Sequence, residues 1–162
     1  MANEVTMPIS LFQIPMFDRN FPYYLNYGTV GEQLARQMAR AFDDIGTRYG
    51  ANGKPMSMWT SNAFNAFQSK SQCLVEQYND FSYPTSSGQS LFVNGSQSLQ
   101  DNLLDHNALA RAWEAWRLHF PLDDPQKQGN KVLPGFENYT PEQMFFISFG
   151  QNLCENDKVF FF

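Results

Sequence analysis

The sequence predicts a mainly α-helical protein with four main helices and at most short strands. Apolar residues recur every three or four positions in four separate stretches, which is the period of a helix that buries one face. Glycine, proline and helix-capping residues bound these stretches. Strand character is confined to residues 91–93, a short apolar run among serine, glycine and proline residues.

The first two helices follow a proline-rich start. Residues 1–24 contain three prolines and are predicted to form an extended lead-in. A first helix is expected over residues 25–45, with Gly46 as its stop, because apolar side chains recur there at near-helical intervals: Val30, Leu34, Met38, Phe42 and Ile45. A second helix is expected to end near residue 79, with one apolar face formed by Trp59, Ala63, Phe67, Ser71, Leu74 and Tyr78.

The second half predicts two more helices after a loop over residues 80–97 with one short strand. The third helix is expected over residues 99–120, ends before Pro121, and is predicted to be buried over much of its girth by Leu99, Leu103, Ala110, Trp113, Trp116 and Phe120. The fourth helix starts with Thr140 as N-cap, Pro141 at its first position and Gln143 three residues past the cap. Its apolar face is Phe145, Phe146, Phe149 and Leu153.

Length and composition predict one domain over residues 1–162, with a lead-in over 1–24, a helical body over 25–154 and an apolar tail over 155–162. The aromatic content of 16% implies a large core or a large buried interface. The formal charge is -5, only 17% of residues are charged, and the basic residues are scattered. These features argue against nucleic acid as a partner.

Targeting signals are not visible in the chain. No apolar run reaches the ~20 residues needed to cross a bilayer, and the N-terminus lacks the basic and apolar regions of a secretion signal. We therefore expect no transmembrane segment and no export route, and localisation stays open. Two cysteines, Cys73 and Cys154, fit neither a disulfide framework nor a metal knuckle by their number and spacing.

Three stretches together resemble the neprilysin and endothelin-converting-enzyme family of zinc peptidases, family M13. They are Asn26-Tyr27-Gly28 ahead of Phe42-Asp43-Asp44, then Ser71-Gln72-Cys73, then Leu133-Pro134-Gly135 leading to Gln143-Met144-Phe145-Phe146. Their order and spacing match the family, and the set covers nearly the whole chain. The resemblance implies part of a helical, thermolysin-like catalytic domain and an extracellular or membrane-anchored ancestor.

The resemblance also implies a zinc site at defined positions. In the family, a His-Glu-x-x-His helix supplies two zinc ligands and a general base, and a later Glu-x-x-x-Asp supplies the third ligand and a carboxylate that orients a ligand histidine. Carried over by position, the histidines become Arg36 and Arg40, the base becomes Gln37, the third ligand becomes Asp101, and Asp105 remains. Arginine offers no lone pair to a metal, and glutamine accepts no proton.

These replacements predict a degenerate homologue that binds no zinc. His106 and His119 are not four residues apart and match no ligand position, and the family's downstream histidine and arginine and its upstream Asn-Ala-aromatic strand are not found in the chain. We hypothesise a binding or regulatory pseudoenzyme whose partner is a peptide or another peptidase chain. The alternatives are a hydrolase with residual or relocated activity, and a truncated product without independent function.

Two arrangements of the arginines remain open. Arg36 and Arg40 lie four residues apart, as do Asp101 and Asp105, so two ion pairs between helices would replace one divalent cation. Alternatively, Arg36 lies on a solvent face opposite Leu34 and Met38 and pairs with a glutamate in its own helix, Glu32, for about 0.2–0.5 kcal/mol.

The remaining candidates are weaker. Cys73 and Cys154 match family cysteines that pair with partners outside this segment, so here they pair with each other, stay reduced or are left unmatched. Asn94 and Asn138 begin glycosylation triplets, although Thr140 is equally explained as a helix cap. Asp43 and the adjacent Asp44 lack the further oxygen ligands that a calcium site requires.

Overall fold

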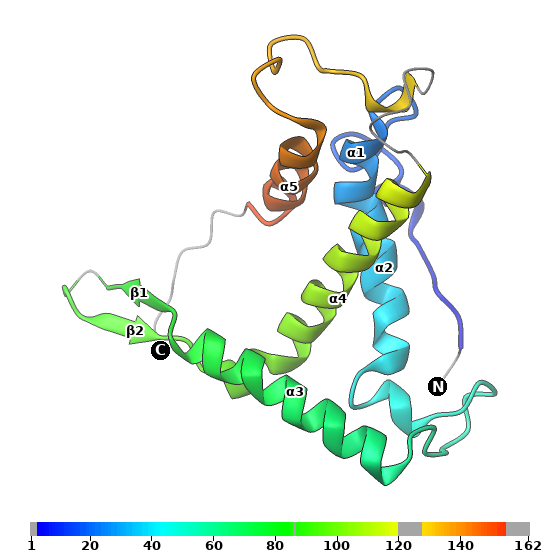
Figure 1. The fold of residues 1–162 in the computed structure, drawn as a ribbon, viewed down its shortest axis with the longest axis vertical. Coiled ribbons are helices and arrows are strands. Elements are labelled where there is room, and N and C mark those ends of the chain that lie inside the picture. The colour runs from blue at the N-terminus through cyan, green and yellow to red at the C-terminus, as the bar shows by residue number, and fades with distance from the viewer. Residues whose placement is uncertain (1–2, 86, 120–127, 155–162) are drawn as a thin grey trace. The chain divides into compact units, whose positions relative to one another are not determined.

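The computed structural model describes residues 3–85, 87–119 and 128–154, and helices dominate this part of the chain (Figure 1). The helices are α1 (Tyr23–Asn26), α2 (Glu32–Ala39), α3 (Ser61–Asn79), α4 (Gly95–His119) and α5 (Pro141–Asn152). The strands within the described residues are β1 (Ser82–Pro84) and β2 (Ser90–Phe92). The predicted mainly α class is confirmed.

The first predicted helix is a continuous helical path that changes its winding. It begins at Tyr23 rather than residue 25, passes through a π-helical turn over Tyr27–Gly31 into α2, and ends in a 3-10 turn at Phe42 rather than at residue 45. A π-helical turn holds more residues than an α-helical one, so it rotates every later side chain about the axis. The apolar row predicted from uninterrupted α-helical spacing is therefore exposed after Val30, at Leu34, Met38, Phe42 and Ile45.

The same rotation turns a polar row inward. Glu32 is only 1% exposed, and the side chain of Arg36, one turn later, is 21% exposed. The prediction that Arg36 lies on the solvent face opposite Leu34 and Met38 is therefore wrong. The phase of α2 is set by the π-helical turn and not by apolar spacing.

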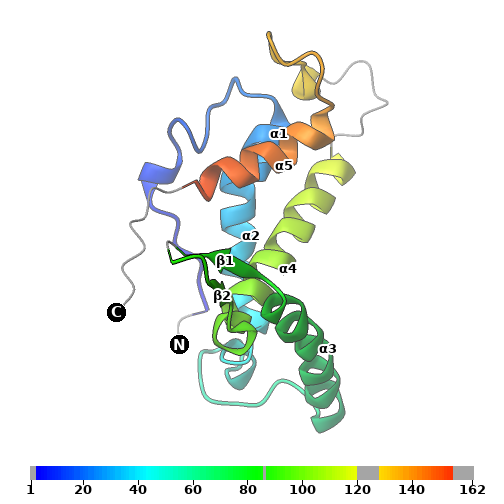
Figure 2. The same ribbon diagram turned by 90° about the vertical axis from the view of Figure 1, so that its left-hand side faces the viewer.

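Helix α3 ends at Asn79 as predicted and is capped at its start by Thr60, whose hydroxyl accepts a hydrogen bond from the backbone N–H of Ala63. The hairpin that follows contains two strands, where the sequence predicted one (Figure 2). Strand β1 ends in Pro84, which excludes a central strand but is compatible with an edge strand. This proline explains why β1 was missed.

Helix α4 starts earlier and is less buried than predicted. It begins at Gly95 rather than at residue 99, because Asn94 caps it through a hydrogen bond from the backbone N–H of Gln97 to Asn94 Oδ1. The prediction of burial over much of its girth is wrong, because its buried residues after the first turn form one i, i+4 stripe: Leu104, Ala108, Ala112 and Trp116. Phe120 lies outside the described residues.

Helix α5 begins as predicted, with a complete capping box. Thr140 Oγ1 accepts from the backbone N–H of Gln143, and the Gln143 side chain accepts from the backbone N–H of Thr140. The preceding Leu133-Pro134-Gly135 turn needs its glycine, because Gly135 has a φ of 86°. The capping box is local, so sequence spacing predicts it well.

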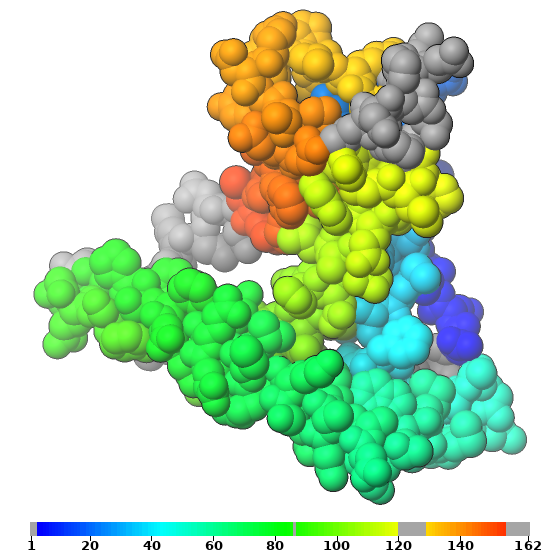
Figure 3. All heavy atoms as spheres, viewed as in Figure 1, coloured from blue at the N-terminus to red at the C-terminus, as the bar shows by residue number. Residues whose placement is uncertain are grey.

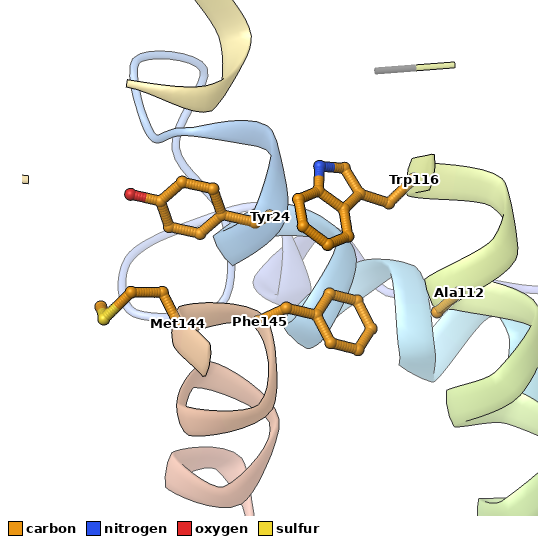
Figure 4. Packing of buried hydrophobic residues seen from close by; sticks show 5 residues of the cluster. All are labelled: Tyr24, Ala112, Trp116, Met144 and Phe145. Carbon is orange, nitrogen blue, oxygen red and sulfur yellow. The ribbon is translucent and has the colours of Figure 1, made fainter. Parts of the chain in front are cut away.

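A core of aromatic rings joins α1, α5 and the C-terminal part of α4 (Figure 4). The fully buried indole of Trp116 stacks on Phe145 at 5.6 Å and meets Tyr24 edge-on at 6.2 Å between ring centroids. Trp116 Nε1 donates to Asn130 Oδ1 at 2.9 Å, and Tyr24 Oη donates to the Lys131 carbonyl at 2.7 Å. Burial raises the pKa of Tyr24. The high aromatic content thus forms a core in this region.

The chain divides into two compact units. One contains Met1–Val5 and Arg36–Asn107, and the other contains Thr6–Ala35 and Ala108–Phe162. The aromatic core belongs to the second unit, and α3 with the hairpin belongs to the first. No helix within the described residues is long and apolar enough to cross a membrane. The single domain over residues 1–162 stays a prediction.

Candidate functional site

The candidate site is a cluster of one arginine and two aspartates from helices α2 and α4, all within the first unit. Arg36 Nη2 lies 2.9 Å from Asp101 Oδ1, and Arg36 Nε donates a hydrogen bond to Asp105 Oδ1. The i, i+4 spacing places both carboxylates on the same face of α4. Three of the five residues assigned by the resemblance therefore lie together.

The electrostatics of the cluster keep Arg36 charged. Its side chain is 21% exposed, compared with 38% for Asp105 and 71% for Asp101. Burial lowers the pKa of Arg36, but the hydrogen bonds and negative charges of Asp105 and Asp101 together outweigh burial and raise it above its ordinary value. Arg36 is thus a permanent cation that offsets one of the two negative charges of the carboxylates.

The other two assigned positions lie outside this cluster. Arg40 is exposed and forms no ion pair with the described residues, whereas Gln37 is half-buried. The expected two-arginine arrangement is therefore half right, because Arg36 alone contacts both aspartates. The contacts of Arg36 with Asp105 and Asp101 join two helices, as the first of the two arrangements predicts.

One residue near this cluster has a role that sequence reasoning missed. Asp43 is 6% exposed and ends the first helical path by accepting hydrogen bonds from the backbone N–H groups of Ile45 and Gly46. Its other oxygen accepts from Gln100 Nε2 at 3.1 Å, next to Asp101. Asp43 therefore ties the end of the α2 path to α4. The sequence feature that could have predicted this role is the position of Asp43 three residues before Gly46, where the helix ends.

The remaining candidates do not assemble into a second site. Both His106 and His119 are exposed on α4, and no group of three or more His, Cys, Asp or Glu within residues 3–85, 87–119 and 128–154 is placed to hold a metal. Cys73 and Cys154 are exposed free thiols, and they belong to different compact units. Asn94 and Asn138 are both exposed.

The residues at the assigned positions do not fit a zinc ion. Zinc sites in proteins use neutral imidazole, thiolate or carboxylate donors in a tetrahedral arrangement. Here a guanidinium, which has no lone pair to donate, contacts the two carboxylates that face it. A zinc ion close to Asp101 and Asp105 would have to displace the charge of Arg36.

A double-mutant cycle on Arg36 and Asp105 measures this pairing. We expect the variants Arg36→Leu, Asp105→Asn and their combination to show a coupling free energy of about 1 kcal/mol in urea unfolding. A larger value is not expected, because Asp105 is 38% exposed and solvent screens the pair. The coupling should fall as salt is added.

Arg40 and Asp101 form the matched control for this cycle. They carry the same charge types, with Arg40 in the 3-10 turn that follows α2 and Asp101 on α4, yet no ion pair joins them. We expect coupling below about 0.3 kcal/mol between Arg40→Leu and Asp101→Asn. Equal coupling in the two cycles would show a general charge effect and would contradict a specific Arg36 contact.

Comparisons with known proteins agree with this fold. Residues 1–160 match the model of peptidase family M13. The chain is 30% identical over 156 residues to Neprilysin-11 of Caenorhabditis elegans, which covers 96% of this chain and 18% of that protein. It is 32% identical over 155 residues to an endothelin-converting enzyme homolog of Locusta migratoria, which covers 94% of this chain and 20% of that protein. The chain spans about a fifth of the length of these relatives.

Solved structures also resemble the fold of this chain. The chain superimposes on the zinc metalloprotease Zmp1 of Mycobacterium tuberculosis in its open state with a TM-score of 0.80 and 25% identity, covering 93% of this chain and 22% of that one. A Haemonchus galactose-containing glycoprotein complex matches with a TM-score of 0.77 and 27% identity, covering 90% of this chain and 22% of that one.

Proposed function

Because the chain belongs to peptidase family M13, we propose that it is a catalytically inactive, neprilysin-like metallopeptidase homologue that acts as a binding or regulatory pseudoenzyme. The ion-pair cluster of Arg36 with Asp101 and Asp105 carries this proposal. The family resemblance implies a metal held between these two helices. In this chain the guanidinium of Arg36 contacts the two carboxylates and offsets one of their negative charges.

The replacements remove both functions of a zinc peptidase site. Zinc polarises the scissile carbonyl and lowers the pKa of its bound water, and neither effect is available from a guanidinium held by two carboxylates. A general base must accept the proton of that water, and the amide of Gln37 has no such capacity near neutral pH. Hydrolysis by this route is therefore not expected.

Residues that support the fold have been retained in the same motifs. Gly28 of the Asn26-Tyr27-Gly28 motif lies against α5, Asp43 caps the end of the α2 path, and Gln143 completes the capping box of α5. The changed residues are those to which the resemblance assigns chemistry. This selectivity favours a protein that uses its fold without the reaction.

An exposed apolar row supports a role in binding. Met38, Phe42 and Ile45 are 56%, 62% and 43% exposed, and they follow one another at intervals of four and three residues. Exposed apolar patches often mark surfaces that contact another polypeptide. We propose a peptide or another peptidase chain as the partner.

Zinc binding by the natural chain and by a restored variant tests the proposal. The restored variant carries the family's residues at four positions: Arg36→His, Gln37→Glu, Arg40→His and Asp101→Glu. We expect the natural chain to purify without zinc and to cleave no peptide, and the restored variant to bind zinc at least about tenfold more tightly than a control with two histidines alone. Chelator competition measures affinity independently of activity.

The control variant is Gln68→His with Gln72→His. Both side chains are exposed on α3 and lie four residues apart, so they reproduce the histidine spacing without a third ligand from another helix. Equal zinc affinity in the control and the restored variant would show that the assigned positions are wrong. Stoichiometric zinc and peptide hydrolysis in the natural chain would show that it is an enzyme, and would overturn the proposal.

A further inference from the structure

The β1–β2 hairpin has two edges that differ in hydrogen-bonding capacity. Residues 82, 83 and 84 pair with 92, 91 and 90, and the ladder continues with hydrogen bonds from Thr85 N to Gln89 O and from Val93 N to Phe81 O. In an antiparallel pair, every second residue directs its backbone N–H and C=O groups away from the partner strand. In this hairpin these residues are 82 and 84 on β1, and 90 and 92 on β2. These outward groups form the two edges of the sheet.

Only the β2 edge offers a complete row of donors and acceptors. Ser90 and Phe92 each present one N–H and one C=O group to the outside, whereas Pro84 on β1 has no N–H. The sheet contains no third strand within the described residues. Strand addition, which needs both donors and acceptors, is therefore favoured at β2 and disfavoured at β1.

The hairpin also lacks the usual protection of an exposed edge. Four large apolar residues lie on it and its flank with exposed fractions between 46% and 65%: Phe81, Tyr83, Leu91 and Phe92. The atoms of the hairpin lie at the surface in the space-filling view (Figure 3). Residues 81–93 contain no charged side chain, although charges on edge strands commonly prevent pairing with other chains.

We propose that β2 pairs antiparallel with β2 of a second copy of this chain, so that two hairpins form one four-stranded sheet. A twofold axis beside β2 places the outward N–H and C=O groups of one copy opposite the same groups of the other, which makes the edge self-complementary. No like charges oppose each other across this contact, despite the net charge of -5 on each chain.

A four-stranded sheet would also remedy the weakness of the hairpin. An isolated two-stranded hairpin is marginally stable in water, and three or more strands with an apolar face are needed for independent stability. Pairing would join two apolar hairpin surfaces and satisfy both β2 edges at once. This inference rests on the hairpin alone and is independent of the proposed function.

Two proline substitutions that differ only in the edge they alter test the proposal. Ser90→Pro removes an outward N–H from β2, and Ser82→Pro removes an outward N–H from β1. We expect sedimentation equilibrium at concentrations up to about 100 μM to show a dimer for the natural chain and for Ser82→Pro. The dissociation constant of Ser90→Pro should rise at least about tenfold.

A second pair of variants tests the same edge without proline. Phe92→Lys places two like charges close together across the proposed axis, whereas Tyr83→Lys adds the same charge to β1. Only Phe92→Lys should weaken the dimer, while the far-UV circular dichroism of both variants stays that of the natural chain. A monomeric natural chain would overturn the proposal and leave the edge to a strand of another protein. A dimer weakened equally by the β1 and β2 variants would also overturn it.

Discussion

Replacing Trp116 by alanine is expected to lower the free energy of unfolding by about 3–5 kcal/mol, the usual range for a buried tryptophan. The indole is 0% exposed and lies between Phe145 of α5 and Tyr24 of α1. Because both neighbours are rings anchored on helices, the cavity left by alanine can collapse only partly. The hydrogen bond from Trp116 to Asn130 is lost as well.

Urea unfolding followed by far-UV circular dichroism is the suitable measurement, because the substitution removes a fluorophore. Leu118→Ala is the matched control, since Leu118 lies on the same helix but is 78% exposed. Its effect should stay within about 0.5 kcal/mol. Similar losses in both variants would show that Trp116 acts through helix α4 itself and not through the aromatic core.

Gly28→Ala is expected to destabilise the chain by about 1–3 kcal/mol, the range for a side chain forced into a packed interior. A Cβ atom at this position would lie 2.2 Å from Ser148 Oγ and 2.5 Å from the backbone oxygen of Phe145. Ser148 is itself buried and donates a hydrogen bond to that same oxygen. The first helical path and α5 would therefore have to move apart.

Gly150→Ala on α5 is the control for this substitution. A Cβ atom there would meet nothing within 4 Å, so the same chemical change removes backbone entropy from the unfolded chain without a clash. We expect it to stabilise the chain by about 0.4–1 kcal/mol. Opposite signs for the two variants, measured by thermal or urea unfolding, would establish Gly28 as a close-packing position. Equal effects would contradict this role.

These two predictions concern residues that the family resemblance shares with active peptidases or that pack beside them. Gly28 belongs to one of the three motifs that carry the resemblance, and Phe145, the neighbour of Trp116, belongs to another. By contrast, Arg36 lies outside these motifs, at a position to which the resemblance assigns a zinc ligand. Packing residues that match the family beside a changed chemical position are what the proposed pseudoenzyme predicts.

Local interactions explain which parts of the fold the sequence predicts well. Thr140 and Gln143 act within three residues of each other, so the start of α5 follows from spacing alone. The spacing does not predict which side chains of α2 face inward, because the π-helical turn over Tyr27–Gly31 interrupts the α-helical period of 3.6 residues. Strand β1 of the hairpin was not predicted, because it is short and ends in proline, a residue that is rare in strands.

The sequence by itself determined the helical class, the capped start of α5 and the chemistry available at residue 36, where a guanidinium cannot serve as a metal ligand. Only the tertiary structure decided which carboxylates that guanidinium contacts. These two partners, Asp101 and Asp105, are 65 and 69 residues away from Arg36 along the chain. Contacts within a turn can be read from spacing, but contacts between helices depend on the phase and packing of whole elements.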